Sequence, residues 1–483
     1  MQHHLKLLTD EQIIQFITQG YLVLNNELPD ELHQKVMRQI HEVLHEEGNP
    51  GNNILPRVPD IQKFFDTPVV KGALTGILGP DYYLHPHRHC HYNQPSNQNP
   101  GGGEWHKDGY WSALRSHRPW WAMIFYYTQD VTEELGPTAI MPGSQYNESY
   151  TGDEHPYLLP TGPAGTMVLV HFDLWHKASL NTSNRDRYML KFQFARLKAP
   201  TAPSWNNQME CFQIPEGEAE SRLPLWQSIW DWMRGEPGIS DANISMDIEQ
   251  LASLAQSQTE NIAIDSAYTL ATAGDAGIQK LHDVISTGTY EAAKRAAYAI
   301  VAAGENAISG LIDLLEHADG ERRTLACFAL GMNGAPKNEI LLGLIQSLTD
   351  KNESVRRHAA EALGMIAEPP KHVVAALAQM LEEAVAKERE VRDEQLSQGY
   401  GQSYIKNKLG YAAALSLLRI GKYGDADEVI SALSKALDST DRYVRAYAFE
   451  ALTHLRTNEA VDVLLRYYRS ARWCPDTNKA SAF

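Results

Sequence analysis

The chain has 483 residues, more than one compact core usually holds, so two or three domains are expected. Its hydrophobic fraction of 43% and charged fraction of 21% are typical of a folded, water-soluble protein. The formal net charge of −17 disfavours nucleic acid as a partner, because an acidic surface repels a phosphate backbone.

Neither a membrane nor a secreted location is expected. No stretch approaches the roughly 20 consecutive apolar residues that cross a bilayer. The opening MQHHLKLLTDEQ lacks the basic and apolar regions of a secretion signal, so a cytoplasmic location is predicted. The four cysteines lie far apart and form no CxxC pair, which disfavours a disulfide framework or a thiolate zinc site.

The composition changes along the chain. Nine of the ten tryptophans lie at or before Trp232, whereas the C-terminal half is rich in Ala, Leu and Glu. We therefore predict an N-terminal domain over residues 1–235 and a C-terminal repeat domain over residues 261–475. Residues 236–260, rich in Gly, Pro, Ser and Asn, would form a linker followed by a short helix.

Two helices followed by short strands are predicted in the N-terminal half. The segment LTDEQIIQFITQGYLVL indicates a helix that starts after Thr9, ends at Gly20 and leads into a strand. Apolar residues every three or four positions predict a second helix over residues 30–47. From about residue 82 to residue 196, segments such as PWWAMIFYYTQDV and GTMVLVHF alternate with Gly/Pro turns. This pattern indicates a jelly-roll barrel flanked by helices.

The segment WHKDGYW carries a candidate metal site. Residues two apart on a strand point to the same face, so the His106 imidazole and the Asp108 carboxylate would converge. His176 follows another predicted strand. Two histidines and one carboxylate facing a barrel interior are the ligand set of non-heme Fe(II) oxygenases. An HxD pair alone is weak evidence, since it also occurs by chance.

Arg187, 11 residues after His176, strengthens this interpretation. An arginine on a strand beside the metal can hold a carboxylate through two parallel hydrogen bonds. 2-Oxoglutarate requires such an anchor, because its keto-acid end chelates iron and its other end is a second carboxylate.

The N-terminal half resembles the phytanoyl-CoA dioxygenase family. The matching segments, in the family order, are LTDEQIIQFITQGYLVL, WHKDGYW, GPTAIMPGSQ and GTMVLVHFDLWHKASLNTSNRDRYML. The resemblance covers about residues 5–200. It implies a double-stranded β-helix, cupin-like barrel that uses Fe(2+), 2-oxoglutarate and O2. It further implies that His106, Asp108 and His176 bind iron and that Arg187 binds 2-oxoglutarate.

The sequence departs from the family pattern at two positions. Gln145 stands where PGSH is common, and Ala178 stands where a small hydroxyl residue often follows the distal histidine. One hydrogen bond to the cosubstrate is thus missing or supplied differently. Asn93 is a further candidate for cosubstrate binding, because family members often place an amide in the preceding strand. Because Asp108 is present, hydroxylation is expected rather than halogenation, which needs a small residue there.

The segment HPHRHCHYN places four histidines on one face of a predicted strand: His85, His87, His89 and His91. They could pack against other side chains, line a substrate pocket, or hold a second metal. We take His87 as a candidate substrate-binding residue. Trp111 is a second candidate, at the mouth of the pocket.

The C-terminal half repeats itself. AYTLATAG, AYAIVAAG and ALGMNG end at residues 274, 304 and 334, a spacing near 30. Two short helices per unit indicate an α-solenoid, and VRRHAAEAL and VRAYAFEAL resemble HEAT repeats. A charged insertion over residues 382–408 interrupts one unit. We interpret it as a solvated helix and loop rather than a binding element.

The sequence thus predicts a multidomain Fe(II)- and 2-oxoglutarate-dependent hydroxylase. Its substrate would be a small molecule, or a group on a carrier or peptide that the repeats present. The repeats could also bind a protein partner or simply brace the barrel. The alternative is a non-catalytic scaffold or sensor that carries a vestigial oxygenase domain.

Overall fold

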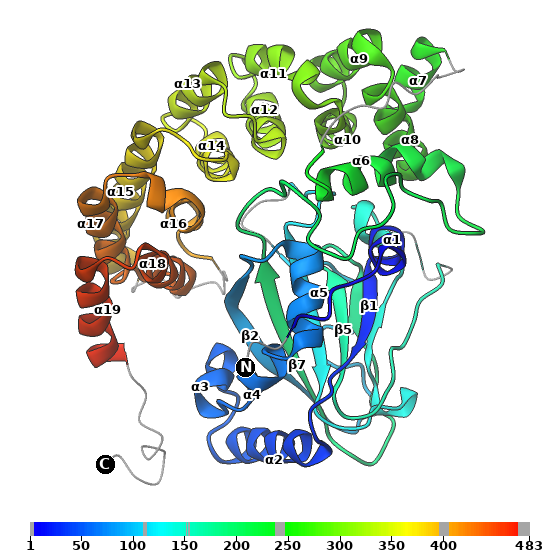
Figure 1. Cartoon of the computed structure of the whole chain (residues 1–483), viewed down its shortest axis with the longest axis vertical. Helices are drawn as coiled ribbons and strands as arrows, with labels where there is room; N and C mark the ends of the chain where they lie inside the picture. The colour runs from blue at the N-terminus through cyan, green and yellow to red at the C-terminus, as the bar shows by residue number, and fades with distance from the viewer. Residues whose placement is uncertain are drawn as a thin grey trace.

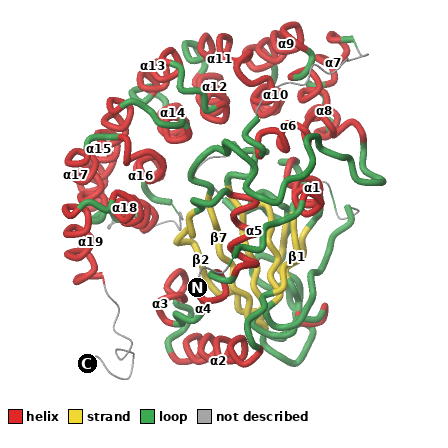
Figure 2. Tube along the Cα trace, in the orientation of Figure 1, coloured by secondary structure: helices red, strands yellow, loops and turns green. Residues whose placement is uncertain are grey.

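The computed structural model describes residues 4–109, 114–150, 152, 155–236, 247–395 and 405–471. Figure 1 shows two parts: a body of strands with helices around it, and an arc of helices that curves over one end of this body. Figure 2 shows that the strands are confined to the N-terminal part. The predicted barrel followed by an α-solenoid is confirmed as the fold class of this multidomain chain.

The N-terminal elements start as the sequence predicts. Helix α1 has a capping box, in which the side chains of Thr9 and Gln12 each bond the other residue's backbone N–H. Gly20 ends the helix in the left-handed conformation, with φ of 76°, and strand β1 follows directly. The helices of this half are α1 (Asp10–Gln19), α2 (Asp30–Glu46), α3 (Ile54–Arg57), α4 (Ile61–Phe65), α5 (Pro68–Leu78) and α6 (Leu223–Met233).

The main sheet is antiparallel and five-stranded, in the order β1-β5-β3-β7-β2. Its strands are β1 (Tyr21–Asn25), β2 (Tyr83–Asn93), β3 (Trp121–Tyr127), β5 (Thr166–His171) and β7 (Arg187–Ala195). The three central strands are buried along their whole length, because α5 packs on one face and the barrel interior lies on the other. This explains their nearly continuous apolar sequences.

A small second sheet completes the barrel. Strand β4 (Thr138–Ile140) pairs with β6 (His176–Ala178). Isolated antiparallel bridges extend this layer, one of them between His106 and His176. The two sheets thus face each other across the interior that contains the candidate metal site.

The C-terminal half is a stack of helix pairs. After α7 (Ile248–Leu254), the described residues form six pairs, in which the even-numbered helices lie on the inner side of the arc. The inner helices are α8 (Glu260–Ala271), α10 (Tyr290–Ile300), α12 (Gly320–Asn333), α14 (Glu353–Met365), α16 (Lys408–Ile420) and α18 (Arg442–Leu455). The outer helices are α9 (Gly274–Thr287), α11 (Ile308–Leu314), α13 (Asn338–Ser347), α15 (Lys371–Gln395), α17 (Ala426–Ala436) and α19 (Asn458–Ala471).

The predicted linker and insertion are only partly described. Residues 237–246 and 396–404 lie outside the described residues, and the predicted short helix after the linker is α7, which starts at Ile248. The first part of the insertion continues α15, which reaches 25 residues. The interpretation of the insertion as a solvated helix and loop is wrong at its described ends, because Val385 and Ile405 are buried against the repeats. The division at residues 235–260 remains a proposal. Among the helices that are described, none is long and apolar enough to cross a bilayer.

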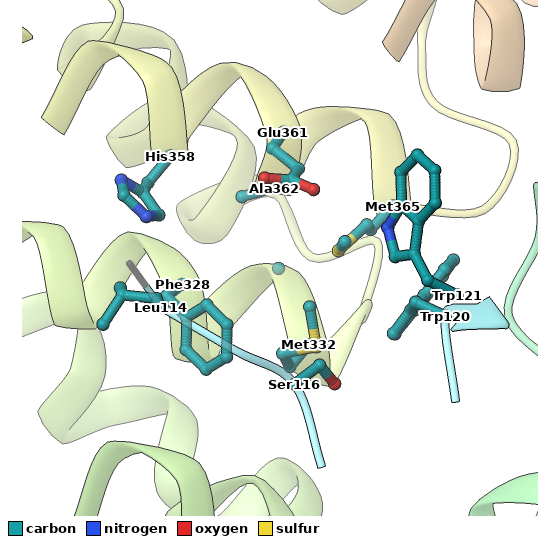
Figure 3. Close-up of a pocket in the computed structure, with 11 residues that line it drawn as sticks. Leu114, Ser116, Trp120, Trp121, Phe328, Met332, His358, Glu361, Ala362 and Met365 are labelled. Carbon is teal, nitrogen blue, oxygen red and sulfur yellow. The ribbon is translucent and has the colours of Figure 1, made fainter. Parts of the chain in front are cut away.

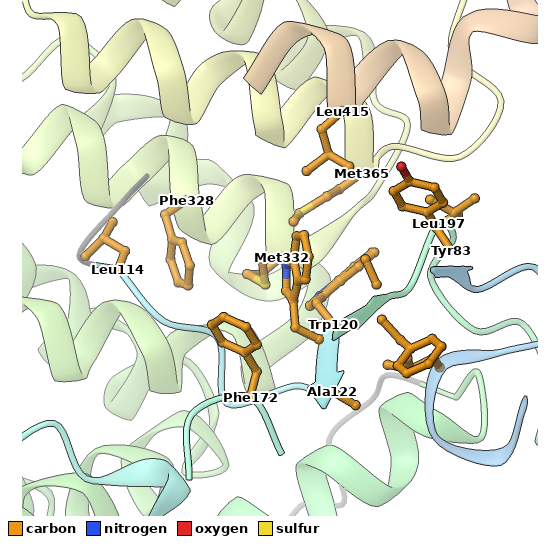
Figure 4. Packing of buried hydrophobic residues seen from close by; sticks show 14 of the residues in the cluster. Tyr83, Leu114, Trp120, Ala122, Phe172, Leu197, Phe328, Met332, Met365 and Leu415 are labelled. Carbon is orange, nitrogen blue, oxygen red and sulfur yellow. The ribbon is translucent and has the colours of Figure 1, made fainter. Parts of the chain in front are cut away.

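The solenoid and the barrel share one apolar core. Figure 4 shows Trp120 and Phe172 of the barrel beside Phe328 and Met332 of α12. Met365 of α14 and Leu415 of α16 extend the same cluster. Burying such side chains is the main stabilising term for contact between two packed parts. The arc is therefore attached to the barrel along its inner side.

Candidate metal centre

The three predicted metal ligands come together on the small sheet. His176 opens β6, and His106 exchanges both backbone hydrogen bonds with it, each 3.0 Å long. The expectation that the HxD pair occupies a regular strand is wrong. Only His106 makes a bridge, and Asp108 lies in irregular structure, held by side chains of β7 rather than by a backbone ladder.

Ligand atoms of His106, Asp108 and His176 all lie within 4.8 Å of one another. Nδ1 of His106 lies 2.8 Å from the Glu104 carbonyl oxygen, and Nδ1 of His176 lies 2.9 Å from the Leu174 carbonyl oxygen. Each Nδ1–H therefore donates to a carbonyl, which leaves Nε2 unprotonated and able to bind a metal.

The Nε2 atom of His176 is a buried acceptor. It makes no hydrogen bond with any of the described residues, although it lies 3.6 Å from Oδ1 of Asp108. Burial lowers the pKa of His176, so its imidazole is neutral at neutral pH. A buried acceptor without a donor costs free energy, and a metal ion would satisfy it.

Asp108 is held by two β7 residues that the sequence analysis missed. Lys191 Nζ lies 2.7 Å from Oδ1 and 2.6 Å from Oδ2 of Asp108, and Gln193 Nε2 donates to Oδ2 at 3.1 Å. Burial by itself would raise the pKa of Asp108, but Lys191 and His176 hold it well below its ordinary value. Lys191 and Gln193 could have been found, because they share the inward face of β7 with Arg187 at alternate positions.

Arg187 opens β7 and is a buried cation. Only 2% of its surface is exposed, and within the described part of the chain it has no counterion and its Nε and Nη1 have no hydrogen-bond partner. Burial lowers the pKa of its guanidinium, and the titratable groups that oppose this shift, Tyr127 and Cys90, are ordinarily uncharged. An unpaired buried guanidinium costs several kcal/mol, on the order of the penalty for any uncompensated ion. The arrangement therefore fits a carboxylate bound at Arg187.

The other cosubstrate candidates lie nearby with different partners. Asn93 pairs with Arg187 across β2 and β7, and its Nδ2 donates to the Ser179 carbonyl at 2.9 Å. Gln145 is instead part of the packing, since its Nε2 donates to the Ile17 carbonyl at 2.9 Å. Ala178 pairs with Thr138 in the small sheet. Asn93 thus remains a candidate through its position beside Arg187.

The four alternating histidines line a cavity of about 420 Å³ that also reaches His106, Asp108 and Lys191. Burial lowers the pKa of His87 to about 4, so its ring is neutral at neutral pH. Within the described part of the chain, these histidines form no cluster of ligand atoms suited to a second metal. Trp111 lies outside the described residues.

Comparison with known proteins agrees with this geometry. Residues 30–189 match the sequence model of the family Phytanoyl-CoA dioxygenase (PhyH), and residues 308–395 match HEAT repeats. The chain therefore carries a phytanoyl-CoA dioxygenase domain and HEAT repeats, as the motifs predict. L-proline trans-4-hydroxylase of Streptomyces griseoviridis is 25% identical over 225 residues, which cover 37% of this chain and 83% of that protein.

Part of the chain also resembles solved structures. One is the alpha-ketoglutarate-dependent carbocyclase SnoK from nogalamycin biosynthesis, with a TM-score of 0.34, 19% identity, and coverage of 40% of this chain and 85% of that one. Another is EctD from S. alaskensis with bound Fe, with a TM-score of 0.32, 16% identity, and coverage of 39% and 76%. At the level of the family, the N-terminal domain is related to iron- and 2-oxoglutarate-dependent oxygenases.

Proposed function

We propose that this protein is an Fe(II)- and 2-oxoglutarate-dependent hydroxylase of a small molecule. The observation that carries the proposal is the pairing of two unsatisfied features in one interior. Three ligand atoms converge, one of them the His176 Nε2 that has no hydrogen-bond partner among the described residues, and Arg187 is buried with no anion among those residues. A divalent metal and a dicarboxylate would satisfy both at once.

His106, Asp108 and His176 would hold the iron. The Nδ1–H bonds to backbone carbonyls fix both imidazole rings, so each Nε2 would be available to the metal without rotation of its ring. Lys191 bonds both oxygens of Asp108, which keeps the carboxylate ionised and oriented. Three protein ligands leave positions open for a chelating 2-oxo acid.

Arg187 would bind the far carboxylate of 2-oxoglutarate. Its guanidinium can form two parallel hydrogen bonds to that group, and the buried surroundings strengthen them. When iron, 2-oxoglutarate and O2 are bound, they supply the oxidation, in which 2-oxoglutarate becomes succinate and CO2. The chain positions these groups and keeps water away from them through buried side chains such as Trp121 and Phe172.

The substrate class is proposed from the cavity and from the curated relative. A volume of about 420 Å³ lies in the lower part of the roughly 300–1,000 Å³ range of small-molecule sites. L-proline trans-4-hydroxylase acts on a free amino acid, so free L-proline is the first compound to test. Neutral histidines on β2 would supply hydrogen bonds to such a molecule.

The decisive experiment is anaerobic addition of Fe(II) and 2-oxoglutarate to the purified protein, with the visible metal-to-ligand charge-transfer band as readout. We expect a band in the wild type, its loss in His176→Ala and its weakening in Arg187→Ala. Succinate formation under air, with and without free L-proline and other amino acids, then measures turnover. If the iron-loaded wild type gives no band, the oxygenase proposal fails and a non-catalytic scaffold becomes the better interpretation.

A further inference from the structure

The inner face of the solenoid is occupied by the barrel of the same chain. Tyr268 of α8 bonds Nδ1 of His117 at 2.9 Å, and Tyr298 of α10 donates to Glu148 at 2.6 Å. Further along, Arg118 donates to the last turn of α12 at the Met332 carbonyl. The inner helices α8, α10 and α12 are therefore in contact with the barrel, on the concave side on which solenoids usually hold partners.

The contacts continue through α14 to α16. Figure 3 shows Trp120 of the barrel beside Met365 and Glu361 of α14. The guanidinium of Arg419, on α16, lies 5.0 Å from the centre of the Trp120 ring. The inner helices thus follow the barrel surface toward the opening of the metal site.

At its far end the solenoid enters the catalytic cavity. The cavity of about 420 Å³ is lined by His106 and Asp108 and also by three residues of the solenoid. We call them the solenoid wall: Ile405, Tyr411 and Tyr443. Arg187 is not among the residues that line this cavity, so the wall lies beside the proposed metal ligands and not beside the proposed anchor of 2-oxoglutarate.

Hydrogen bonds tie the wall to the histidine strand. Tyr443 bonds Nδ1 of His87 at 2.6 Å. The backbone N–H of His87 donates to Nδ1 of His85, so the neutral His85 ring carries its proton on Nε2. That Nε2–H donates to Tyr447 at 2.8 Å, and the Tyr447 hydroxyl donates to Tyr411 at 2.7 Å.

This direction of donation has a consequence for Tyr411. Its hydroxyl oxygen accepts from Tyr447, and its own proton has no acceptor among the described residues. Because Tyr411 lines the cavity, that proton is available to a molecule bound there. If the wall only stabilised the barrel, a hydroxyl donor without an acceptor in this cavity would cost free energy and serve no function.

We propose that the solenoid wall is part of the substrate site and that Tyr443 determines which small molecules fit beside the metal. The repeats then serve the barrel's own chemistry, and the substrate is a free small molecule rather than a group on a protein held in the arc. This inference rests on the proposed function, because it takes the cavity beside His106 and Asp108 as the substrate pocket.

The test measures the size of the cavity at the metal without knowledge of the substrate. The Co(II)·2-oxoglutarate form of the full chain is titrated with imidazole and with 4-phenylimidazole, and the visible d–d bands report binding to the metal. The variants are Tyr443→Ala and the matched Tyr268→Ala. Both remove an inner-helix tyrosine that bonds a barrel histidine, but Tyr268 lies outside the cavity.

We expect Tyr443→Ala to raise the affinity for 4-phenylimidazole relative to imidazole by about tenfold, because it opens the wall. Tyr268→Ala should leave that ratio unchanged. If Tyr443→Ala does not fold, Tyr443→Leu and Tyr268→Leu replace the pair.

If the ratio of the affinities for 4-phenylimidazole and imidazole is the same in both variants, the proposal that the wall is part of the substrate site is wrong, and the solenoid only stabilises the barrel. The same holds if neither probe binds the metal in any variant. Failure of the wild type to form the Co(II)·2-oxoglutarate complex overturns the proposed function itself and is seen before any imidazole is added.

Discussion

Replacing Arg187 with methionine separates the effect of the buried guanidinium on protein stability from its effect on the binding of 2-oxoglutarate. Arg187 is almost completely buried, and two of its nitrogens have no hydrogen-bond partner among the residues that the structure describes. A methionine of similar length removes this unpaired charge and leaves no buried donor. We therefore expect the ligand-free variant to be as stable as the wild type, or more stable by about 1–4 kcal/mol.

The same change should abolish tight binding of 2-oxoglutarate. Two charge-assisted hydrogen bonds in a buried site contribute about 3–5 kcal/mol together. This corresponds to a rise in the Kd of 2-oxoglutarate of about 100- to 5,000-fold. Iron affinity should change little, because Arg187 is not among the three grouped metal ligands.

Thermal melting with Mn(II) present, at increasing 2-oxoglutarate, measures both effects. The wild type should gain stability with ligand concentration, and Arg187→Met should not. Arg196→Met is the matched control, because Arg196 is equally buried but donates to the Ile77 carbonyl at 2.8 Å. It should melt earlier and keep the response to 2-oxoglutarate. A wild-type-like response in Arg187→Met would refute the assignment of the anchor.

Three further predictions follow from particular contacts. Asp108→Ala removes a metal ligand and should weaken Mn(II) binding by more than about 100-fold in calorimetry; an unchanged Kd would exclude this carboxylate from the site. Arg118→Met removes the buried donor to the α10–α12 region and should speed proteolysis at residues 234–260, whereas an unchanged cleavage rate would show that this contact does not hold the arc. Burial raises the pKa of Glu361 from 4.5 to about 7, against the attraction of Arg419, so its contribution to stability is fully present below pH 4.5 and is lost as pH rises through about 7. As the pH rises from 4.5 to 8, the free energy of unfolding of Glu361→Gln should therefore increase relative to that of the wild type, by at most about 3 kcal/mol. A difference in melting temperature between the two proteins that stays constant across that range would contradict this.

Local elements could be predicted from the sequence because their signals are local. The helix after Thr9 has its capping box and its terminal glycine within a dozen residues, so its limits follow without tertiary information. The repeat spacing near 30 likewise indicated stacked helix pairs. The order of His106, Asp108, His176 and Arg187 along the chain was enough to suggest the metal and the dicarboxylate anchor.

The neighbours of these residues could not be predicted in the same way. Lys191 and Gln193 meet Asp108 only because β7 crosses the barrel beside an irregular loop, and such pairing depends on sheet register. The irregular course around Asp108 also replaced the expected strand, since side-chain contacts there take the place of a backbone ladder.

The sequence by itself determined the fold class of each half and suggested the reactive groups, because hydrophobic periodicity, caps and motif spacing act over short stretches of chain. Only the tertiary structure decided how the two halves relate. Tyr443 and His87 are 356 residues apart, and no local pattern links them. Their contact exists because the curvature of the solenoid, summed over many repeats, brings its last inner helices back to the barrel.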